Sequence, residues 1–467
     1  MTIAFTAADA ARWTGGALRR GAPDARFTGV SIDTRALRPG QLFVAIRGPR
    51  HDAHAFLAQA AEAGAAGVVV ARDAALPEGL GGLPVVAVED TTRALGALAA
   101  GHRASFDGPL VAITGSNGKT TTKEMCAAIY ATSAPCLRTR GNLNNEYGLP
   151  LTLLERDAAH RSVVVELGMN HRGEIARLAA IALPTVGVLT NVGTAHIEFL
   201  GSRDEIAREK GDLLAALPAN GVAVVNGDDP RARAQAERTR ARVLAFGLAP
   251  EADVRAERIT PLGERGYAFD LVAPEGRQAV HVAGLGDATV SNALAAAAAA
   301  LAGGCSVADV ASGLAAYEPI GGRMERVALP RNIIVVNDTY NANPQSVEQA
   351  LRSLARLRGS SRGVAVLGDM GELGEAADEA HRAAGRLVAE LGLDFLFTLG
   401  PRAEVTAAGA LEAGMDPSRV HVGKDHEGLA GSLRQLLRGN DWVLVKGSRS
   451  MRMERVVEAL SRAGEGA

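Results

Sequence analysis

The sequence predicts an α/β protein of three domains, and three observations support this class. The chain has 467 residues, which corresponds to about three domains of typical size. Short apolar runs rich in valine alternate with helix-forming stretches, as in parallel strands joined by crossover helices. One such run, 109–114, leads into a glycine-bracketed turn and then a helix. We expect a small N-terminal α/β domain over 1–107, a central parallel-sheet domain with this loop over 108–319, and a C-terminal α/β domain over 320–467.

Composition and charge limit the kinds of molecule that we expect this protein to bind. The formal net charge is -2, so there is no electrostatic reason to expect nucleic acid or an anionic membrane as a partner. Three cysteines at no metal-like spacing suit a reducing cytoplasm better than a disulfide framework. Residues 1–9 lack the pattern of a signal peptide, and the longest apolar run, 293–302, is too short to span a bilayer. We expect a cytoplasmic protein in which 293–302 is a buried, alanine-rich helix.

The N-terminal domain shows strand signals at 29–35, 40–48 and 66–70 and a helix signal at 54–63. Two polar clusters follow the first two strand signals and supply hydroxyl, carboxylate and arginine groups. Such groups could hold a phosphorylated, sugar-bearing substrate, and solvated turns are the alternative. The candidate substrate residues are Ser31, Asp33, Thr34, Arg35, Arg47, Asp52 and His54. The Asp107-Gly108-Pro109 segment is the predicted linker to the next domain.

The glycine-bracketed turn has the features of a phosphate-binding loop. Backbone N–H groups of such a loop and the positive end of the following helix face the phosphates of a nucleotide. Lys119 would reach the β- and γ-phosphates, and the Thr120 hydroxyl would bind Mg²⁺. Ile113 replaces the first glycine of the longer pattern, so an ordinary strand–helix turn is the alternative. The candidate nucleotide-binding residues are Thr114, Gly115, Ser116, Asn117, Gly118, Lys119, Thr120 and Thr121.

Two further strand ends of the central domain carry polar groups. Glu166 ends the apolar run 162–166, and ligands of open α/β sheets bind at such ends. It is therefore a candidate Mg²⁺ ligand beside Thr120, unless it is simply solvated. The strand at 185–192 leads to His196, which taken alone would more often be structural, because Mg²⁺ prefers oxygen ligands. A helix at 203–217 follows and carries Lys210.

The use of lysine is selective. Only five of the 50 basic residues are lysine, at positions 119, 123, 210, 424 and 446. Arginine is always charged, whereas the pKa of a lysine can be lowered until it acts as an amine. We therefore expect a position that keeps lysine, such as Lys210, to be one where the chemistry requires an amine. Chance explains the presence of lysine at Lys123 and Lys424 equally well.

Taken together, these motifs resemble the ATP-dependent Mur ligases over essentially the whole chain. In the central domain the motifs are T-G-S-N-G-K-T at 114–120, G-N-L-N-N-E-Y-G-L-P at 141–150, E-L-G-M-N at 166–170, T-N-V-G-T-A-H-I-E-F-L-G-S at 190–202 and E-K-G-D at 209–212. In the C-terminal domain they are G-G-R-M-E-R at 321–326, N-D-T-Y-N-A-N-P-Q-S at 337–346, L-G-D-M-G-E-L-G at 367–374 and V-K-G-S-R at 445–449. The resemblance implies a Rossmann-like C-terminal domain.

The resemblance also implies roles for the candidate residues. The lysine that matches Lys210 is carbamylated in the family, and with Glu166 and His196 the carbamate would position a second Mg²⁺, while Thr120 and Glu166 hold the first. Asn292 matches an adenine-side asparagine, although the His-Asn pair usual before it is absent here. Asp338 would accept from the ribose hydroxyls, and Arg323 and Lys446 would reach the phosphates. The remaining matched substrate residues are Asn142, Asn144, Asn145, Asn341, Asn343 and Ser346.

Within the family, the G-N-L-N-N-E and D-T-Y-N-A-N-P runs are most similar to the member that joins D-alanyl-D-alanine to UDP-N-acetylmuramoyl-tripeptide, through an acyl phosphate, for peptidoglycan synthesis. The D-N-P-R motif of the diaminopimelate-adding member is absent. The alternatives are another amide ligase of this type, such as a diaminopimelate- or lysine-adding or folylpolyglutamate-like enzyme, and a non-catalytic ATP-binding protein. The implied partners are the two small-molecule substrates and ATP, and the implied oligomeric state is a monomer.

Overall fold

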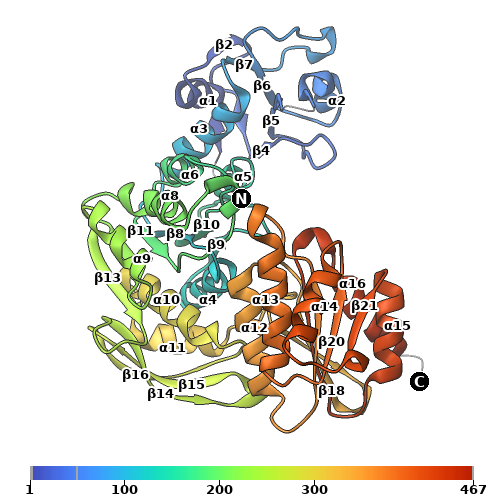
Figure 1. Ribbon diagram of the computed structural model, residues 1–467. Helices are drawn as coiled ribbons and strands as arrows, with labels where there is room; N and C mark the ends of the chain where they lie inside the picture. The colour runs from blue at the N-terminus through green and yellow to red at the C-terminus, as the bar shows by residue number, and fades with distance from the viewer. Residues whose placement is uncertain (1–3, 49–50, 465–467) are drawn as a thin grey trace.

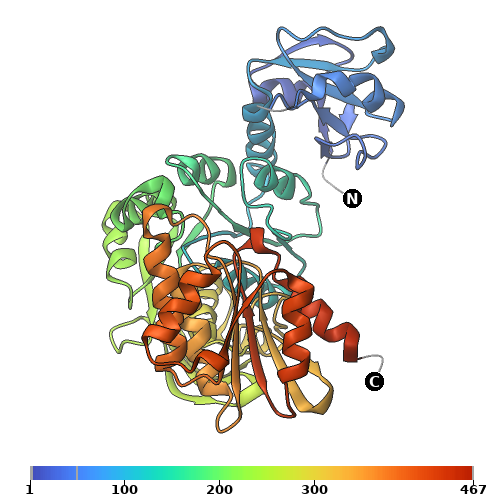
Figure 2. The ribbon, with the colours of Figure 1, turned by 45° about the vertical axis from the view of Figure 1, so that its right-hand side comes forward.

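The computed structural model describes residues 4–48 and 51–464, and its three large β-sheets follow one another along the chain (Figure 1). They span residues 17–88, 110–282 and 325–446, so each sheet lies within one of the predicted domain ranges. The N-terminal part projects from the central part, whereas the central and C-terminal parts lie side by side (Figures 1 and 2). Residues 1–3, which belong to the N-terminal run 1–9 considered above, and residues 49–50 of the polar run 47–54 lie outside the described residues.

The N-terminal sheet has five strands, parallel except for the antiparallel edge strand β2. In sheet order they are β2 (Ala17–Arg20), β7 (Val85–Val88), β6 (Gly67–Ala71), β5 (Leu42–Val44) and β4 (Val30–Ser31), and a small separate sheet pairs β1 (Phe5–Thr6) with β3 (Arg26–Phe27). The helices are α1 (Ala7–Thr14), α2 (Leu57–Glu62), preceded by the 3-10 turn η1 (Ala53–Phe56), and α3 (Thr91–Arg103). The strand predicted at 29–35 contracts to β4, because the Asp33 carboxylate accepts from the Arg35 N–H and turns the chain.

The central sheet has nine strands, of which the seven from β9 to β14 in sheet order are parallel. In sheet order they are β16 (Gly276–Val282), β15 (Tyr267–Ala273), β14 (Val254–Pro261), β13 (Arg242–Gly247), β12 (Val222–Asn226), β11 (Val186–Leu189), β8 (Leu110–Thr114), β10 (Ser162–Glu166) and β9 (Cys136–Arg138). β14, β15 and β16 form an antiparallel ribbon that the sequence analysis did not predict. The outer strand β16 is mostly exposed, so it lacks the continuous apolar run of a buried parallel strand.

Two layers of helices cover this sheet because its strands are apolar on both faces. Alternate residues such as Val111 and Ile113 face α4 (Lys119–Ala131), α10 (Ala288–Ala302) and α11 (Val307–Ala315). Leu110 and Ala112 face the opposite layer, formed by α5 (Gly148–Leu154), α6 (Glu174–Ala182) and α8 (Arg203–Ala215). The short helices α7 (Ile197–Leu200) and α9 (Pro230–Ala234) lie in the connections. The predicted alanine-rich helix is confirmed as α10, whose residues 293–301 are buried.

The C-terminal sheet has six strands, parallel except for the antiparallel edge strand β17. In sheet order they are β17 (Glu325–Leu329), β18 (Ile333–Asp338), β22 (Trp442–Lys446), β19 (Gly363–Gly368), β20 (Phe395–Leu399) and β21 (Val420–Gly423). The helices are α12 (Pro344–Leu357), α13 (Ala377–Glu390), α14 (Ala403–Glu412), α15 (His426–Leu436) and α16 (Glu454–Gly464). The strands predicted near 332–337, 363–367, 395–399 and 442–445 are confirmed. Across the described residues, every helix is too short or too polar to cross a membrane.

The strand order brings the predicted polar groups together. β11, β8 and β10 are neighbours, so the segments that follow them meet at one edge of the central sheet. In the C-terminal sheet β18 and β22 are neighbours, and their register pairs Asp338 with Lys446. The two carboxyl edges face the same cavity.

Candidate active site

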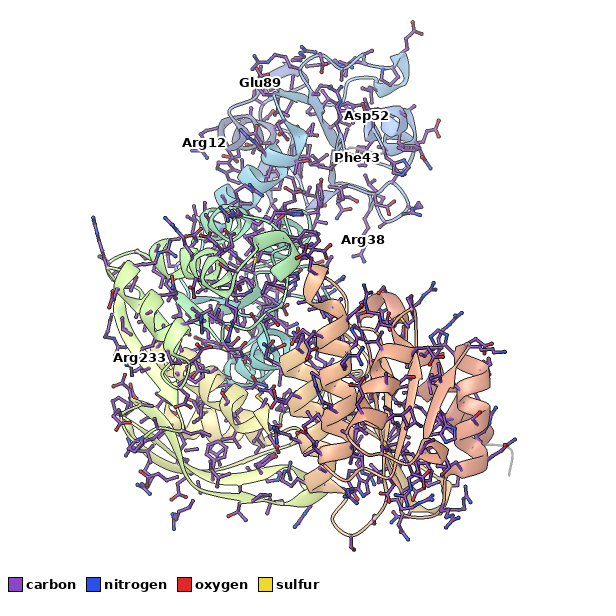
Figure 3. All side chains as sticks on the ribbon, in the orientation of Figure 1. Arg12, Arg38, Phe43, Asp52, Glu89 and Arg233 are labelled. Atoms are coloured by element: carbon purple, nitrogen blue, oxygen red, sulfur yellow. The ribbon has the colours of Figure 1, made fainter. Side chains whose placement is uncertain are left out.

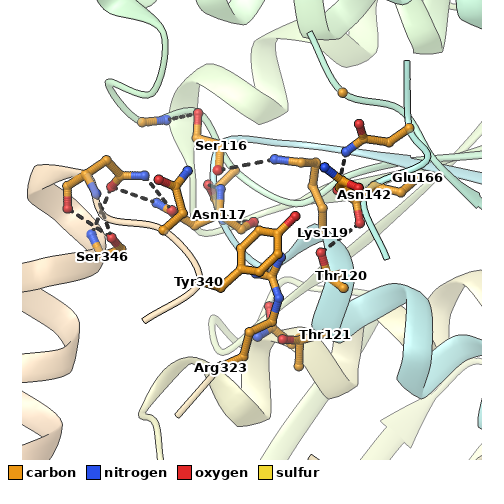
Figure 4. Close-up of a pocket in the computed structure, with 18 of the residues that line it drawn as sticks. Ser116, Asn117, Lys119, Thr120, Thr121, Asn142, Glu166, Arg323, Tyr340 and Ser346 are labelled. Atoms are coloured by element: carbon orange, nitrogen blue, oxygen red, sulfur yellow. Dashed lines mark hydrogen bonds between the residues drawn. The ribbon is translucent and has the colours of Figure 1, made fainter. Parts of the chain in front are cut away.

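A cavity of about 1540 Å³ lies between the central and C-terminal domains, and α3 of the N-terminal domain also lines it. It is larger than the roughly 300–1,000 Å³ of an ordinary small-molecule pocket, so it has room for more than one ligand. Its wall includes candidate residues from both domains, several of which are labelled in Figure 4. The candidates that line it are Ser116, Asn117, Gly118, Lys119, Thr120, Thr121, Asn142, Asn144, Asn145, Glu166, His196, Asn292, Arg323, Asp338, Asn341, Asn343, Ser346 and Lys446.

The phosphate loop needs glycine at both of its ends. Gly115 has φ +152°, and a Cβ on it would lie 1.9 Å from the Thr190 hydroxyl. Gly118 has φ +81°, and a Cβ on it would lie 2.2 Å from the Asn292 side-chain oxygen. The missing Cβ atoms allow two distant segments to close on the loop. Asn292, predicted on the adenine side, therefore lies directly against the start of α4.

The segment after β11 fixes the loop by hydrogen bonds. Asn117 N–H donates to the Asn191 side chain at 2.9 Å, and the Asn191 amide donates back to the Asn117 carbonyl at 3.0 Å. Ser116 N–H donates to the Asn191 carbonyl, and Gly193 N–H donates to the Ser116 hydroxyl at 2.8 Å. These contacts orient the loop. Asn191 was not among the predicted site residues, although it belongs to the T-N-V-G-T motif.

Two lysine side chains donate to the same backbone carbonyl of the phosphate loop. Lys119 Nζ donates to the Gly115 carbonyl at 2.8 Å, and Lys210 Nζ donates to the same carbonyl at 3.0 Å. Burial lowers the pKa of Lys119 and lowers that of Lys210 well below its usual value, and the positive charge of Lys119 lowers the latter further. Lys210 is only 1% exposed. Of the candidate residues in and near the loop, Thr114, Gly115 and Lys210 do not line the cavity.

Glu166 is placed at the end of β10 as predicted. Thr120 Oγ1 donates to one of its carboxylate oxygens at 2.7 Å, and Asn144 Nδ2 donates to the other at 2.9 Å (Figure 4). Burial alone would raise the pKa of Glu166, but the charges of Lys119 and Arg323 and the hydrogen bonds from Thr120 and Asn144 hold it below its usual value. A carboxylate and a hydroxyl thus meet beside the phosphate loop.

His196 lies on the cavity wall, with its Nδ1 atom 2.6 Å from a carboxylate oxygen of Glu372. The preceding Thr194 donates from both its N–H and its hydroxyl to the Gln345 side chain, at 3.2 and 2.8 Å. Glu372 and Gln345 belong to the C-terminal part, so this segment connects the two domains. Neither residue was predicted.

Asp338 and Lys446 form one unit. Lys446 Nζ lies 2.5 Å from the Asp338 carboxylate and donates to the Asn341 carbonyl at 2.9 Å. Met324 N–H donates to the other Asp338 oxygen at 3.2 Å. The sequence analysis assigned the two residues separate roles, at the ribose and at the phosphates, whereas here they neutralise each other at the cavity wall.

Arg323 projects into the cavity over an aromatic ring. Its guanidinium lies 4.0 Å from the centroid of Tyr340, which also lines the cavity (Figure 4). A guanidinium at this distance is attracted to the ring, and the flat contact restricts its orientation. Tyr340 was missed, although it stands in the quoted D-T-Y-N-A-N-P run.

The start of α12 contacts the phosphate loop. Asn343 caps this helix by accepting from Ser346 N–H at 3.0 Å, and Asn343 Nδ2 donates to the Asn117 side chain at 2.8 Å. At the other side of the cavity, Asn145 accepts from Gly148 N–H and so begins α5. These asparagines, predicted on the substrate side, also hold local structure.

The N-terminal candidates are not brought to this cavity, as the position of Asp52 in Figure 3 illustrates. Arg35 pairs with Asp33 at 2.7 Å and lowers the pKa of Asp33 to about 2. Arg47 pairs with Asp52 at 3.1 Å and with Asp73 at 3.0 Å. The other members are also engaged: Ser31 Oγ donates to the Asp33 carbonyl, Thr34 Oγ1 to the Gln59 side chain, and His54 Nε2 accepts from Ala71 N–H.

Known proteins show the same architecture. Residues 26–103 match the description "Mur ligase family, catalytic domain", residues 113–300 the Mur ligase middle domain, and residues 322–449 the Mur ligase glutamate ligase domain. These matches cover most of the chain. The chain belongs to the Mur ligase family.

Relatives of this Mur ligase match it from end to end. It is 36% identical to the UDP-N-acetylmuramoyl-tripeptide–D-alanyl-D-alanine ligase of Escherichia coli K12, over 94% of this chain and 95% of the relative. The ligase of the same name from Synechocystis is 39% identical, over 94% and 92%. A crystal structure of MurF from Acinetobacter baumannii superposes with a TM-score of 0.90, at 33% identity and 99% coverage of both chains. MurF from Thermotoga maritima in complex with ADP gives a TM-score of 0.81 at 29% identity, over 94% and 98%.

Proposed function

We propose that this Mur ligase is an ADP-forming amide ligase that joins D-alanyl-D-alanine to UDP-N-acetylmuramoyl-tripeptide, a step of peptidoglycan precursor synthesis. One observation carries the proposal. A single cavity places the phosphate loop and Glu166 of the central domain opposite Arg323, Asp338 and Lys446 of the C-terminal domain. The relatives named for this reaction match nearly the whole chain, which supports the choice of substrates.

The first half of the reaction is phosphoryl transfer. The terminal carboxylate of the tripeptide attacks the γ-phosphorus of ATP, the bond to the β-phosphate oxygen breaks, and an acyl phosphate and ADP form. The N-terminal end of α4, which begins at Lys119, would face the phosphates, and Lys119 Nζ would supply a positive charge once it turns from the Gly115 carbonyl. Arg323, held over Tyr340, lies where it can stabilise charge on the transferred group.

Magnesium fits the residues beside the loop. The Thr120 hydroxyl and the Glu166 carboxylate are oxygen donors 2.7 Å apart, and oxygen is the donor that Mg²⁺ prefers. We propose that these two hold one ion and that Glu166, His196 and a carbamylated Lys210 hold a second. When bound, magnesium would neutralise negative charge on the phosphates. Among the described residues, no three His, Cys, Asp or Glu side chains are clustered to bind a metal, so a carbamate on Lys210 would add the missing carboxylate-like group.

The surroundings of Lys210 suit carbamylation. An amine reacts with carbon dioxide only when it is neutral, and burial together with the charge of Lys119 favours the neutral form of Lys210. The product is an anion that Lys119 would then stabilise at close range.

The second half of the reaction is acyl transfer. The free amine of D-alanyl-D-alanine attacks the acyl carbon, a tetrahedral intermediate forms, and phosphate leaves with the bonding electrons. We propose that Asn341, Asn343 and Ser346 line the side from which the amine enters, and that Asn142, Asn144 and Asn145 lie on the tripeptide side. Lys446 would stabilise the acyl phosphate, and Asp338 and Asn292 would contact the ribose and adenine of the nucleotide.

The remaining assignments concern the whole chain. We propose that residues 1–107 bind the UDP part of the substrate through Ser31, Asp33, Thr34, Arg35, Arg47, Asp52 and His54, that residues 108–319 bind ATP, and that residues 320–467 complete the ligase site. Each range contains one large sheet, which supports the division. Three free cysteines agree with a cytoplasmic location, and we propose a monomer.

The test is a phosphate-release assay with defined substrates. We expect turnover only when UDP-N-acetylmuramoyl-tripeptide, D-alanyl-D-alanine and ATP are all present, with UDP-N-acetylmuramoyl-pentapeptide as the product by mass spectrometry. Separate panels offer the dipeptide precursor with diaminopimelate or lysine, and a folate with glutamate. Full turnover in either panel, and none with D-alanyl-D-alanine, would overturn the assignment.

A further inference from the structure

A contact between a histidine ring and a carboxylate crosses the boundary between the central and C-terminal domains at the wall of the cavity. His196 follows β11 in the central domain, and Glu372 follows β19 in the C-terminal domain. The Nδ1 atom of His196 lies 2.6 Å from the Glu372 carboxylate, which lowers the pKa of Glu372. The contact is therefore made by two segments that meet only when the domains lie together.

The surrounding contacts hold both segments in place. Glu198 N–H lies 3.5 Å from the Glu372 carbonyl. Ile197 packs against the apolar core of the C-terminal domain, a core that includes Leu373. His196 and its neighbours are thus packed between the phosphate-loop side and the C-terminal domain.

Both partners adopt a backbone conformation that side-chain-bearing residues avoid. His196 has φ 66° and Glu372 has φ 60°. Such conformations cost energy and persist where surrounding contacts enforce them, often at functional sites. The His196–Glu372 contact thus joins two residues that both adopt such a conformation.

Stability does not explain the pair. The Glu372 side chain is 44% exposed and that of His196 is 18% exposed. An ion pair with so much solvent around it contributes little to folding. What a carboxylate at Nδ1 does provide is a fixed tautomer and ring orientation, which leave Nε2 free to act as a ligand or acceptor.

We propose that Glu372 is a positioning residue, which orients the His196 ring toward the cavity and does so only when the C-terminal domain is docked. The Nδ1 atom is buried, and the Glu372 carboxylate at 2.6 Å is the acidic group beside it. Docking of the domain would thereby complete the site. The proposal rests on the proposed function only for its kinetic readout.

The test uses the full-length protein with Glu372→Gln, which keeps the shape and removes the charge. The matched control is Glu375→Gln, an exposed glutamate three positions along the same loop. Steady-state kinetics give kcat and KM for each substrate, and thermal unfolding gives Tm. The ¹⁵N shifts of histidine-labelled protein report the His196 tautomer, and His196→Gln assigns that signal.

We expect Glu372→Gln to lower kcat on the order of 10- to 100-fold, with KM and Tm close to those of the control. The His196 ring signal should move away from the Nδ1–H tautomer, and Glu372→Asp should recover part of both effects. A kcat equal to that of Glu375→Gln, or an unchanged His196 tautomer, would overturn the proposal. If the unaltered protein shows no ligase turnover, the proposed function fails, while the tautomer measurement still decides the role of Glu372.

Discussion

At the scale of single residues, burial gives Lys210 a chemistry that lysine usually lacks. The chain uses arginine for nearly all of its positive charges, yet keeps lysine at a position that is 1% exposed and adjacent to Lys119. An arginine there would stay charged beside another cation. The selective use of lysine and the burial of Lys210 beside Lys119 therefore both favour a neutral amine at this position.

This predicts that Lys210→Arg loses activity. The guanidinium keeps a positive charge but cannot be carbamylated, so we expect kcat to fall on the order of 100-fold or more, or about 3 kcal/mol of transition-state stabilisation. Lys424→Arg, at an exposed position, is the control. The measurement is phosphate release under saturating substrates. Near-normal turnover of Lys210→Arg would exclude the carbamate, whereas partial rescue of Lys210→Ala by formate or acetate would support it.

A second prediction concerns the Asp338–Lys446 pair. Asp338→Asn leaves the Lys446 ammonium, which is 3% exposed, without its carboxylate partner. We expect weaker ATP binding together with a loss of stability on the order of 2–3 kcal/mol. The double variant Asp338→Asn/Lys446→Met should regain the stability but not the activity. Calorimetry and thermal unfolding measure the two effects separately, and unchanged ATP affinity in Asp338→Asn would remove Asp338 from the nucleotide site.

At the scale of elements, the phosphate loop shows which features can be predicted from the sequence and which cannot. The strand, the loop, the helix start at Lys119 and the carboxylate at the end of β10 all follow from local patterns and were predicted. Asn191, Gln345 and Glu372 were not, because each acts through a contact with a segment far away in the chain. Tyr340 was also missed, because the sequence does not specify its contact with the Arg323 guanidinium. All four residues stand in the quoted motifs, but a single sequence without its fold does not say which segment each one contacts.

The dependence on local patterns also explains the other differences between the predicted and the observed structure. The β14–β16 ribbon was missed because its outer strand is largely exposed and so lacks an apolar run. The polar clusters near Asp33 and Arg47 were correctly located after strands, but local patterns cannot say that these clusters lie away from the main cavity, which α3 of the same domain does reach. Whether they bind substrate stays a prediction.

A third prediction belongs to the loop as an element. Asn191→Ala removes two hydrogen bonds to Asn117 and leaves the loop less fixed. We expect the KM for ATP to rise and stability to fall on the order of 1–3 kcal/mol. Asn220→Ala, in an exposed turn, is the control. Initial rates at varied ATP, with urea unfolding, measure both effects, and an unchanged KM would mean that the loop keeps its shape without Asn191.

At the scale of the whole molecule, the joint between the N-terminal and central domains contains a buried histidine and two buried arginines. His102 and Arg103 end α3, and Arg156 follows α5; all three side chains are at most 6% exposed. Arg103 donates to the Ala182 and Leu183 carbonyls, and Arg156 donates to the Ser105 hydroxyl. The Phe106 ring lies between the two guanidinium groups, at 5.4 and 4.9 Å. Asp107 is the acidic group that acts on Arg103.

This joint predicts a loss of stability in mild acid. Burial, reinforced by the charge of Arg156, lowers the pKa of His102 from 6.5 to about 4. The unfolded chain therefore binds a proton that the folded chain does not between pH 6.5 and about 4, so the stabilisation is complete above pH 6.5 and declines as the pH falls through this window. A shift of this size corresponds to about 3 kcal/mol of folding stability.

His102→Gln should flatten the dependence of stability on pH, whereas His51→Gln, at an exposed histidine, should not. Thermal midpoints of the three proteins from pH 7.5 to 4.5 provide the measurement, and parallel curves for His102→Gln and the unaltered chain would show that acid acts on the fold elsewhere.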